Sequence, residues 1–174
     1  MGDREVTGSA HPETAALLGV LRSQRAHVLG ALDGLDEDAL HRPVLPSGWS
    51  CLGLVRHLAL DVERFWFRAV VSGDPDVIAA LEGAEDAWAV RPGTPSREVL
   101  ARYRAEASRA DGVIEGSAPD AALAWWPPSS HGQQHLHTLR DVMLHVITET
   151  ACHAGHIDAV RELLDGRRWL VMPS

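Results

Sequence analysis

The sequence predicts an all-α fold, because four long segments space their apolar residues at the three- and four-residue steps of an amphipathic helix. These segments cover residues 12–32, 51–73, 96–114 and 138–164. The stretches between them hold prolines and glycines, which interrupt helices. We therefore expect helices and almost nothing else.

The first two predicted helices have recognisable starts. Pro12 suits the first turn of the first helix, whose apolar spacing continues to Leu32. Ser50 fits the N-cap of the second helix, which ends at Gly73. Between the two helices, "HRPVLPSGWS" (residues 41–50) contains two prolines and a glycine, so no regular structure is expected there.

The second half of the chain predicts two further long helices and one long loop. Residues 75–92 predict a short helix and a turn, and the third long helix runs from about Ser96 to Ile114. The loop "DAALAWWPPSSHGQQHLH" (residues 120–137) is too long for a tight turn, and such loops are often functional. Thr138 and Asp141 form a variant of the capping box at the start of the last helix.

Composition limits the class of protein. A chain of 174 residues that is 45% hydrophobic fits one compact domain over residues 1–174. Sixteen arginines, no lysine and twenty-four acidic residues give a net charge of −8, which predicts no nucleic-acid partner. The first ten residues are polar and no apolar run approaches ~18 residues, so we expect a cytoplasmic protein without a membrane partner.

One stretch of the last helix interrupts its apolar stripe. The stripe consists of Leu139, Val142, Val146, Ile157, Val160 and Leu164. Between Val146 and Ile157 the same three- and four-residue steps fall on Glu149 and His153. This predicts a carboxylate and an imidazole that face inward, one turn apart. Burying an unpaired carboxylate costs roughly several kcal/mol. Because Arg140 and Arg161 lie two or more turns away, a metal ion is the expected partner.

His57 is the best candidate for a third ligand, since it lies among the apolar residues of the second helix. A ligand from one helix and an i, i+4 pair from another is a common way to build a metal site in a helix bundle. Two histidines and one carboxylate with open positions describe a catalytic zinc site, and the same set suits non-haem Fe(II). The alternative is that Glu149 and His153 form a side-chain pair at a solvated seam, because nothing in the sequence requires the two helices to face each other.

Two segments carry a resemblance to a known family. "SGWSCLGLVRHLALDVERFWFR" (residues 47–68) and "TLRDVMLHVITETACHAGHIDAVRELLDG" (residues 138–166) resemble the signature segments of the DinB/YfiT-like superfamily. They are most similar to its small actinobacterial branch, akin to the N-terminal domain of mycothiol-dependent maleylpyruvate isomerase. The sequence lacks the additional C-terminal domain of that isomerase, which puts the isomerase reaction itself in doubt.

The resemblance implies a fold and a metal site. The fold is a four-helix bundle with a long crossover connection and short extra helices. One divalent metal is expected at one end of the bundle, on His57, Glu149 and His153. Zinc or nickel is the expected ion in recombinant material, and iron is also compatible. A homodimer is a further expectation from the family, with weak local support from the apolar face around Trp66 and Phe67.

The resemblance also implies a reaction, because relatives of known activity are thiol S-transferases. We expect a metal-dependent enzyme that joins a low-molecular-weight thiol, such as mycothiol, to a small electrophile. Trp49, Trp125 and Trp126, with the loop that continues to His137, would hold the two substrates. His145 and His156 could act as general bases. The alternative is a non-catalytic metal-binding bundle with a stress-linked or sensing role.

Several other side chains leave their roles open. Asp61, one turn after His57, could orient that ligand. Neither cysteine sits in a CxxC pair, and Cys152 is expected to be a buried small hydrophobe. Three arginines could anchor a substrate carboxylate, but each is more often a surface residue, and no role follows for Arg56, Arg64 or Arg140.

Overall fold

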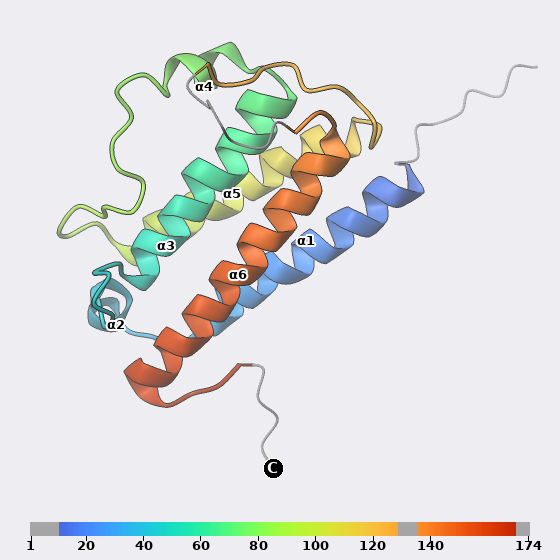
Figure 1. The fold of residues 1–174 in the computed structure, drawn as a ribbon. Helices are drawn as coiled ribbons and strands as arrows, with labels where there is room; N and C mark the ends of the chain where they lie inside the picture. Colours follow the sequence, from blue (N-terminus) through green and yellow to red (C-terminus); the bar gives the residue numbers. More distant parts are fainter. Residues whose placement is uncertain (1–10, 129–135, 170–174) are drawn as a thin grey trace, which may run out of the picture.

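The computed structural model describes residues 11–128 and 136–169. Within these residues four long helical segments lie side by side, and two short helices flank them (Figure 1). The long segments are α1 (Pro12–Ala31), α3 (Cys51–His57) continued by η1 (Leu58–Val71), α5 (Ser96–Glu115) and α6 (Leu139–Asp165). The short helices are α2 (Glu37–His41) and α4 (Pro75–Ala79).

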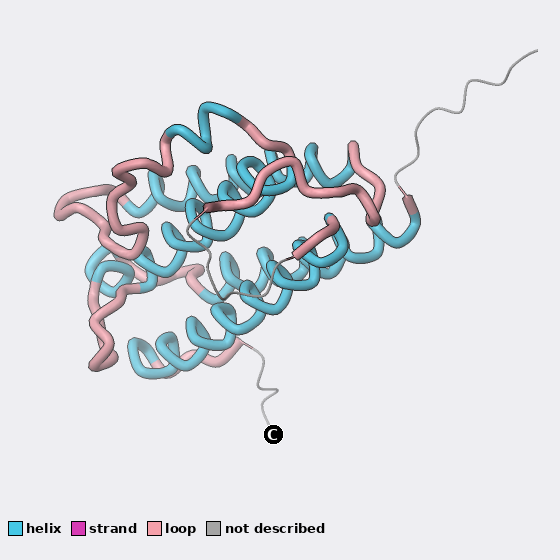
Figure 2. Tube along the Cα trace, turned by 45° about the horizontal axis from the view of Figure 1, so that its top comes forward, coloured by secondary structure: helices cyan, strands magenta, loops and turns pink. Residues whose placement is uncertain are grey.

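The described residues contain no strand, and Figure 2 shows helices and connecting loops alone. A single isolated bridge joins Ala122 to Thr138. The all-α prediction is therefore confirmed. The more specific prediction of a four-helix bundle with a long crossover connection stays a prediction.

The core lies between two pairs of packed helices. α1 packs along α6, η1 packs along α5, and α6 also contacts η1 (Figure 1). Large apolar side chains from all four segments are fully buried there, among them Leu21, Leu58, Phe67, Ile114 and Ile157. The seam between α6 and the α3–η1 helix is the part of this core that concerns function.

The predicted helix starts are confirmed. Ser50 Oγ accepts a hydrogen bond from the Gly53 amide at 3.1 Å, as an N-cap does. At the start of α6 the Thr138 hydroxyl accepts from the Asp141 amide, and the Asp141 carboxylate accepts from the Thr138 amide at 3.0 Å. This reciprocal pair is the capping box.

Helix α2 is an element that the sequence did not reveal. The Asp36 carboxylate accepts from the Ala39 amide at 2.8 Å and caps the helix. The helix has only five residues, so it is too short to show an apolar period. Its last residue, His41, begins the stretch in which no regular structure was expected, so that prediction is wrong at this one position.

The second long helix changes its hydrogen-bonding pattern after His57. It is α-helical to His57 and then takes the wider π-helical hydrogen-bonding pattern. Steps of four or five positions join four of its buried apolar residues, Leu58, Val62, Phe67 and Val71, and Ala59, Ala69 and Val70 are buried beside them. Phe67 consequently lies fully inside the core. It cannot belong to a surplus apolar face, so the local argument for a dimer from Trp66 and Phe67 is wrong as far as Phe67 is concerned.

The buried stripe of α6 does not pass through Glu149 and His153 as predicted. Its buried residues in this region are Val146, Thr150, Ala154 and Ile157. Glu149 and His153 lie one position earlier, about 100° around the helix. They therefore sit at the edge of the stripe. This places them on the seam with the α3–η1 helix, as the contact between Glu149 and His57 shows.

Candidate metal centre

The seam brings His57, Glu149 and His153 together. One ligand atom from each of the three residues lies within 4.8 Å of the others. Oε1 of Glu149 lies 3.1 Å from Nε2 of His153 and 3.7 Å from Nε2 of His57. The histidine side chains are 13% and 12% exposed and that of Glu149 is 37% exposed, so the cluster is sheltered but reachable from the carboxylate side.

A hydrogen bond to Asp61 orients the ring of His57. Its Nδ1 lies 2.9 Å from Oδ2 of Asp61, one turn along η1. A carboxylate only accepts hydrogen bonds, so Nδ1 is the donor here, and in the neutral ring the lone pair is then on Nε2. That Nε2 is buried and has no hydrogen-bond partner within residues 11–128 and 136–169. His57 therefore aims an unused nitrogen at Glu149 and His153, in the arrangement by which a carboxylate orients a metal-binding histidine.

The three side chains fit a divalent cation. Among the described residues, only the two imidazoles lie within ion-pair distance of Glu149. Burial, together with the nearby His57 and His156 rings, lowers the pKa of His153 below its ordinary value, although Glu149 opposes this effect. His153 is therefore neutral near pH 7, which is the form that binds metals. Two imidazoles and one carboxylate suit zinc, nickel or Fe(II).

Indole rings close one side of the cluster. Trp88 stacks on His57 with ring centroids 4.2 Å apart and planes at 15°, and its ring meets the edge of His153 at 5.6 Å. Trp49 contacts Trp88 at 6.4 Å and His156 at 6.3 Å. Trp49 was expected at the site, whereas no feature of the sequence singled out Trp88.

The loop that carries Trp88 is held against α3 by a close backbone approach. A Cβ atom at Gly53 would lie 2.4 Å from the Trp88 carbonyl oxygen, so only glycine fits there. The Arg56 guanidinium also donates to the Asp86 carbonyl oxygen at 2.5 Å. A glycine inside a helix normally costs about 1 kcal/mol. Gly53 was therefore the one local signal that another chain segment lies close to this helix.

The remaining predicted site residues divide into two groups. His156 Nδ1 lies 3.4 Å from His153 Nδ1, next to the cluster. His145 packs instead against Trp66, with centroids 4.7 Å apart. Trp126 also packs on Trp66, and Trp125 packs on Phe65. The structure thus brings Trp49 and His156 to the cluster, while His145, Trp125 and Trp126 join the aromatic side chains of η1.

Two pockets lie beside the cluster. The first, of about 460 Å³, is lined by Ser47, Gly48, Trp49, Asp86, Trp88 and Ala89. The second, of about 630 Å³, is lined by Asp61, Phe65, Ile78, Leu81, Glu82, Trp125, Pro127 and Pro128. Each contains a residue that contacts His57, because Trp88 stacks on its ring and Asp61 lies 2.9 Å from its Nδ1. Of the predicted substrate loop, residues 129–135, including His131 and His135, lie outside the described residues.

Neither cysteine belongs to the cluster. Cys51 is buried in the core, and burial raises the pKa of its thiol to about 11. Cys152 is exposed, so the expectation of a buried small hydrophobe is wrong. The reason is helical geometry, because consecutive residues point about 100° apart and His153 faces the seam.

The three arginines singled out earlier have different surroundings. Arg140 forms an ion pair with Glu13, including a contact of 2.8 Å from its Nη2. Arg56 supports the loop of Trp88. Arg64 is the exception, because its buried Nε has no hydrogen-bond partner.

Comparison with known proteins places the site within a family. A family model described as "MST: Mycothiol-S-transferase" matches residues 16–166, a range that includes all three residues of the cluster. No curated protein matches the chain.

Among the described residues, no helix combines the length and the apolar character that a membrane crossing requires.

Proposed function

The chain belongs to the mycothiol-S-transferase family, and from this premise we propose that it joins a low-molecular-weight thiol, mycothiol or a close analogue, to a small electrophile at the His57–Glu149–His153 cluster. The observation that carries the proposal is the Nε2 atom of His57. It is buried, has no hydrogen-bond partner and faces a carboxylate and a second imidazole. A purely structural cluster would leave that desolvated atom unsatisfied at a cost of about 1–3 kcal/mol.

In this proposal His57, Glu149 and His153 hold one divalent cation, zinc or nickel, with iron also compatible. When bound, such a cation supplies positive charge that lowers the pKa of a thiol beside it, so that the thiolate is present near neutral pH. Asp61 fixes the direction of the His57 ring. Trp88 covers the same ring and excludes water from that side.

His156 is the residue best placed to take the thiol proton. It contacts His153 and is exposed, so it can pass the proton on to solvent. The sulfur lone pair then forms the new S–C bond, and the leaving group departs with the electrons of the bond that breaks. His145 lies on Trp66, so in this scheme it contacts the substrate instead of taking the proton from sulfur.

The aromatic side chains provide the surfaces for both substrates. We propose that the sugar part of the thiol lies in the pocket of Trp49 and Trp88, against their indole faces. The electrophile then occupies the pocket beside Asp61, whose wall includes Trp125 and Phe65, with Trp126 packed behind through Trp66. This division leaves the sulfur and the electrophilic carbon to meet at the cluster.

Further parts of the proposal concern the whole protein. We propose a single cytoplasmic domain that acts as a homodimer and has no nucleic-acid partner, in keeping with its net charge of −8. Light scattering at micromolar protein should give about twice the 18.9 kDa mass of one chain. A mass equal to one chain would contradict the dimer.

The deciding experiment combines metal analysis with a screen of thiols and electrophiles. Purified protein should bind one divalent metal per chain and consume mycothiol with at least one small electrophile. His153→Ala should lose both properties, whereas Thr148→Ala, an exposed change on the same helix, should lose neither. Protein that binds no divalent metal would contradict the site. Protein that binds metal in this site but turns over no thiol would favour the alternative, a metal-binding bundle without catalysis.

A further inference from the structure

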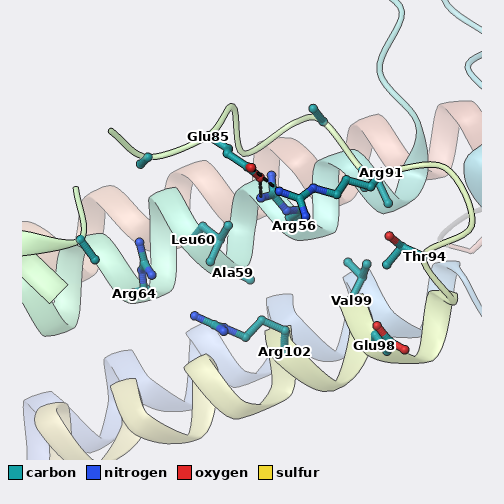
Figure 3. Close-up of a pocket in the computed structure, with 14 residues that line it drawn as sticks. Arg56, Ala59, Leu60, Arg64, Glu85, Arg91, Thr94, Glu98, Val99 and Arg102 are labelled. Carbon is teal, nitrogen blue, oxygen red and sulfur yellow. Dashed lines mark hydrogen bonds and ion pairs between the residues drawn. The ribbon is translucent and has the colours of Figure 1, made fainter. Parts of the chain in front are cut away.

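A third pocket lies between the α3–η1 helix and α5, under the loop of residues 80–94 (Figure 3). Its volume is about 650 Å³, which is in the range of small-molecule sites. None of the three cluster residues lines it. We call it the arginine pocket, and its lining residues are Arg56, Ala59, Leu60, Arg64, Ala80, Ala84, Glu85, Ala89, Val90, Arg91, Thr94, Glu98, Val99 and Arg102.

The charge of the arginine pocket is opposite to that of the whole chain. Four arginines and two glutamates line it, although the protein carries a net charge of −8. Glu85 is already engaged, because Arg91 forms an ion pair with it and Arg56 lies 3.8 Å away. Among the described residues, Arg64 is the one arginine of the pocket that forms no ion pair, because Arg102 pairs with Glu106.

Arg64 differs from the other arginines that are at least partly buried. Arg25 and Arg68 each form ion pairs, and Arg161 donates to carbonyl oxygens as well as to Asp165. The Nε atom of Arg64, by contrast, is buried and has no hydrogen-bond partner in the part of the chain that the structure describes. Burial, together with the positive charge of Arg102, lowers the pKa of Arg64. A guanidinium that loses water without gaining an acceptor is destabilising, so an anion at this position would be favourable.

Arg102 faces the same space from the opposite wall. Its Nε is used by Glu106 at 2.9 Å, and its side chain extends from α5 toward Arg64 on η1 (Figure 3). Two guanidinium groups that converge from two helices can hold one oxyanion between them, since each offers paired N–H donors to carboxylate or phosphate oxygens.

We propose that the arginine pocket binds a small organic anion, with its carboxylate or phosphate group between Arg64 and Arg102. The apolar body of the ligand lies against the apolar part of the wall, which includes Leu60, Val90 and Val99. This combination selects an organic anion over inorganic phosphate, because the apolar wall gains nothing from an ion that is polar on every side.

The test uses the full-length protein and four probes that differ in charge and body. Benzoate and phenyl phosphate carry the two candidate oxyanions, benzamide is the uncharged counterpart of benzoate, and inorganic phosphate lacks an apolar body. Calorimetric titration should show binding of benzoate or phenyl phosphate, and the tighter of the two identifies the group. Benzamide and inorganic phosphate should each bind about tenfold more weakly or not at all.

Variants locate the binding. Arg64→Gln should weaken the binding of the preferred probe about tenfold or more, and Arg64→Lys should restore part of it. Arg104→Gln, an exposed position on α5 outside the pocket, should change nothing. Metal content should be equal in all variants, which separates this test from that of the metal site. Equal binding of benzamide and benzoate, no binding of either organic anion, or unchanged binding in folded Arg64→Gln would each overturn the proposal.

Discussion

Carboxylates that are shielded from solvent have two different kinds of partner in this molecule. Glu63 lies in the core, and each of its two carboxylate oxygens accepts a hydrogen bond from Arg25, at 2.6 and 2.7 Å. Glu106 is equally buried and is surrounded by Arg68, Arg102 and Arg109. At the seam, Glu149 has two imidazoles and no arginine within ion-pair distance among the residues that the structure describes.

The difference indicates what each region is for. Among the described residues, the two carboxylates that lie fully in the core, Glu63 and Glu106, are each neutralised by arginine. At Glu149 the chain supplies two imidazole nitrogens instead, one of them on a ring that Asp61 holds in place. In our proposal a cation from outside completes this set. The core pairs would then belong to the fold, and the seam cluster to a ligand.

The largest expected effect comes from breaking a core pair. Arg25→Met leaves Glu63, whose side chain is 1% exposed, without its cation. We expect a loss of about 3–5 kcal/mol in the free energy of unfolding, measured by urea denaturation. Arg22→Met is the matched control, because Arg22 pairs on the surface with Asp111 and Glu115 and should cost about 1 kcal/mol or less.

A second variant makes this prediction sharper. The double change Arg25→Met, Glu63→Met removes both charges and should recover most of the lost stability, as buried ion pairs replaced by apolar residues often do. If Arg25→Met were as mild as Arg22→Met, the distinction between a core pair and a surface pair would not hold here.

The next effect concerns the seam cluster and requires metal. Saturating zinc should raise the free energy of unfolding by about 2.7 kcal/mol at a free concentration one hundred times the dissociation constant, and a chelator should reverse this. Glu149→Gln should lose this response, because the only negative charge among the three ligands is gone. The metal-free variant should be about as stable as the metal-free parent. If Glu149→Gln destabilised the metal-free protein as Arg25→Met does, Glu149 would belong to the fold after all.

A smaller effect is expected from the residue behind the cluster. Asp61→Asn leaves a side chain of the same size but removes the carboxylate that fixes the protonation of His57. Metal affinity should fall about 10- to 100-fold. Asp61 is 52% exposed, so stability without metal should change little. Competition with a coloured chelator gives the affinity, and unchanged metal binding would show that the contact with Asp61 does not orient the ligand.

The sequence predicted what depends on neighbours along the chain. The four long helices follow from apolar spacing and from the caps at Ser50 and Thr138. Glu149 and His153 share one edge of α6 because they are four residues apart, and this relation was also visible. That they lie at the edge of the buried stripe was not visible. A periodic pattern leaves the position of a residue around the helix axis uncertain by about one residue.

Contacts between segments that are far apart in the chain could not be predicted from the sequence. Trp88 covers His57 only because a loop approaches Gly53, and the pairing of Arg25 with Glu63 spans 38 positions. Neither contact leaves a periodic trace in the sequence. His57 was chosen as the third ligand from its apolar surroundings on the second helix, and the family resemblance supported this choice. Spacing on one helix does not tell which other helix it faces, so its contact with Glu149 could not be derived from the pattern alone.

The smallest expected effect is on thiol transfer when both cysteines are replaced, and it tests whether the imported thiol is the nucleophile. With a pKa of about 11, Cys51 would be a thiolate in only about one molecule in ten thousand at pH 7. Cys152 is exposed and points away from the seam. Cys51→Ser, Cys152→Ser should therefore keep its metal and its rate of thiol transfer, whereas His57→Ala should lose both. A double variant that retains metal and fold but has no activity would show that the nucleophile comes from the protein. The cluster would then stabilise a charge on the electrophile, and the contrast between core carboxylates and Glu149 would still describe where the metal binds but not what it activates.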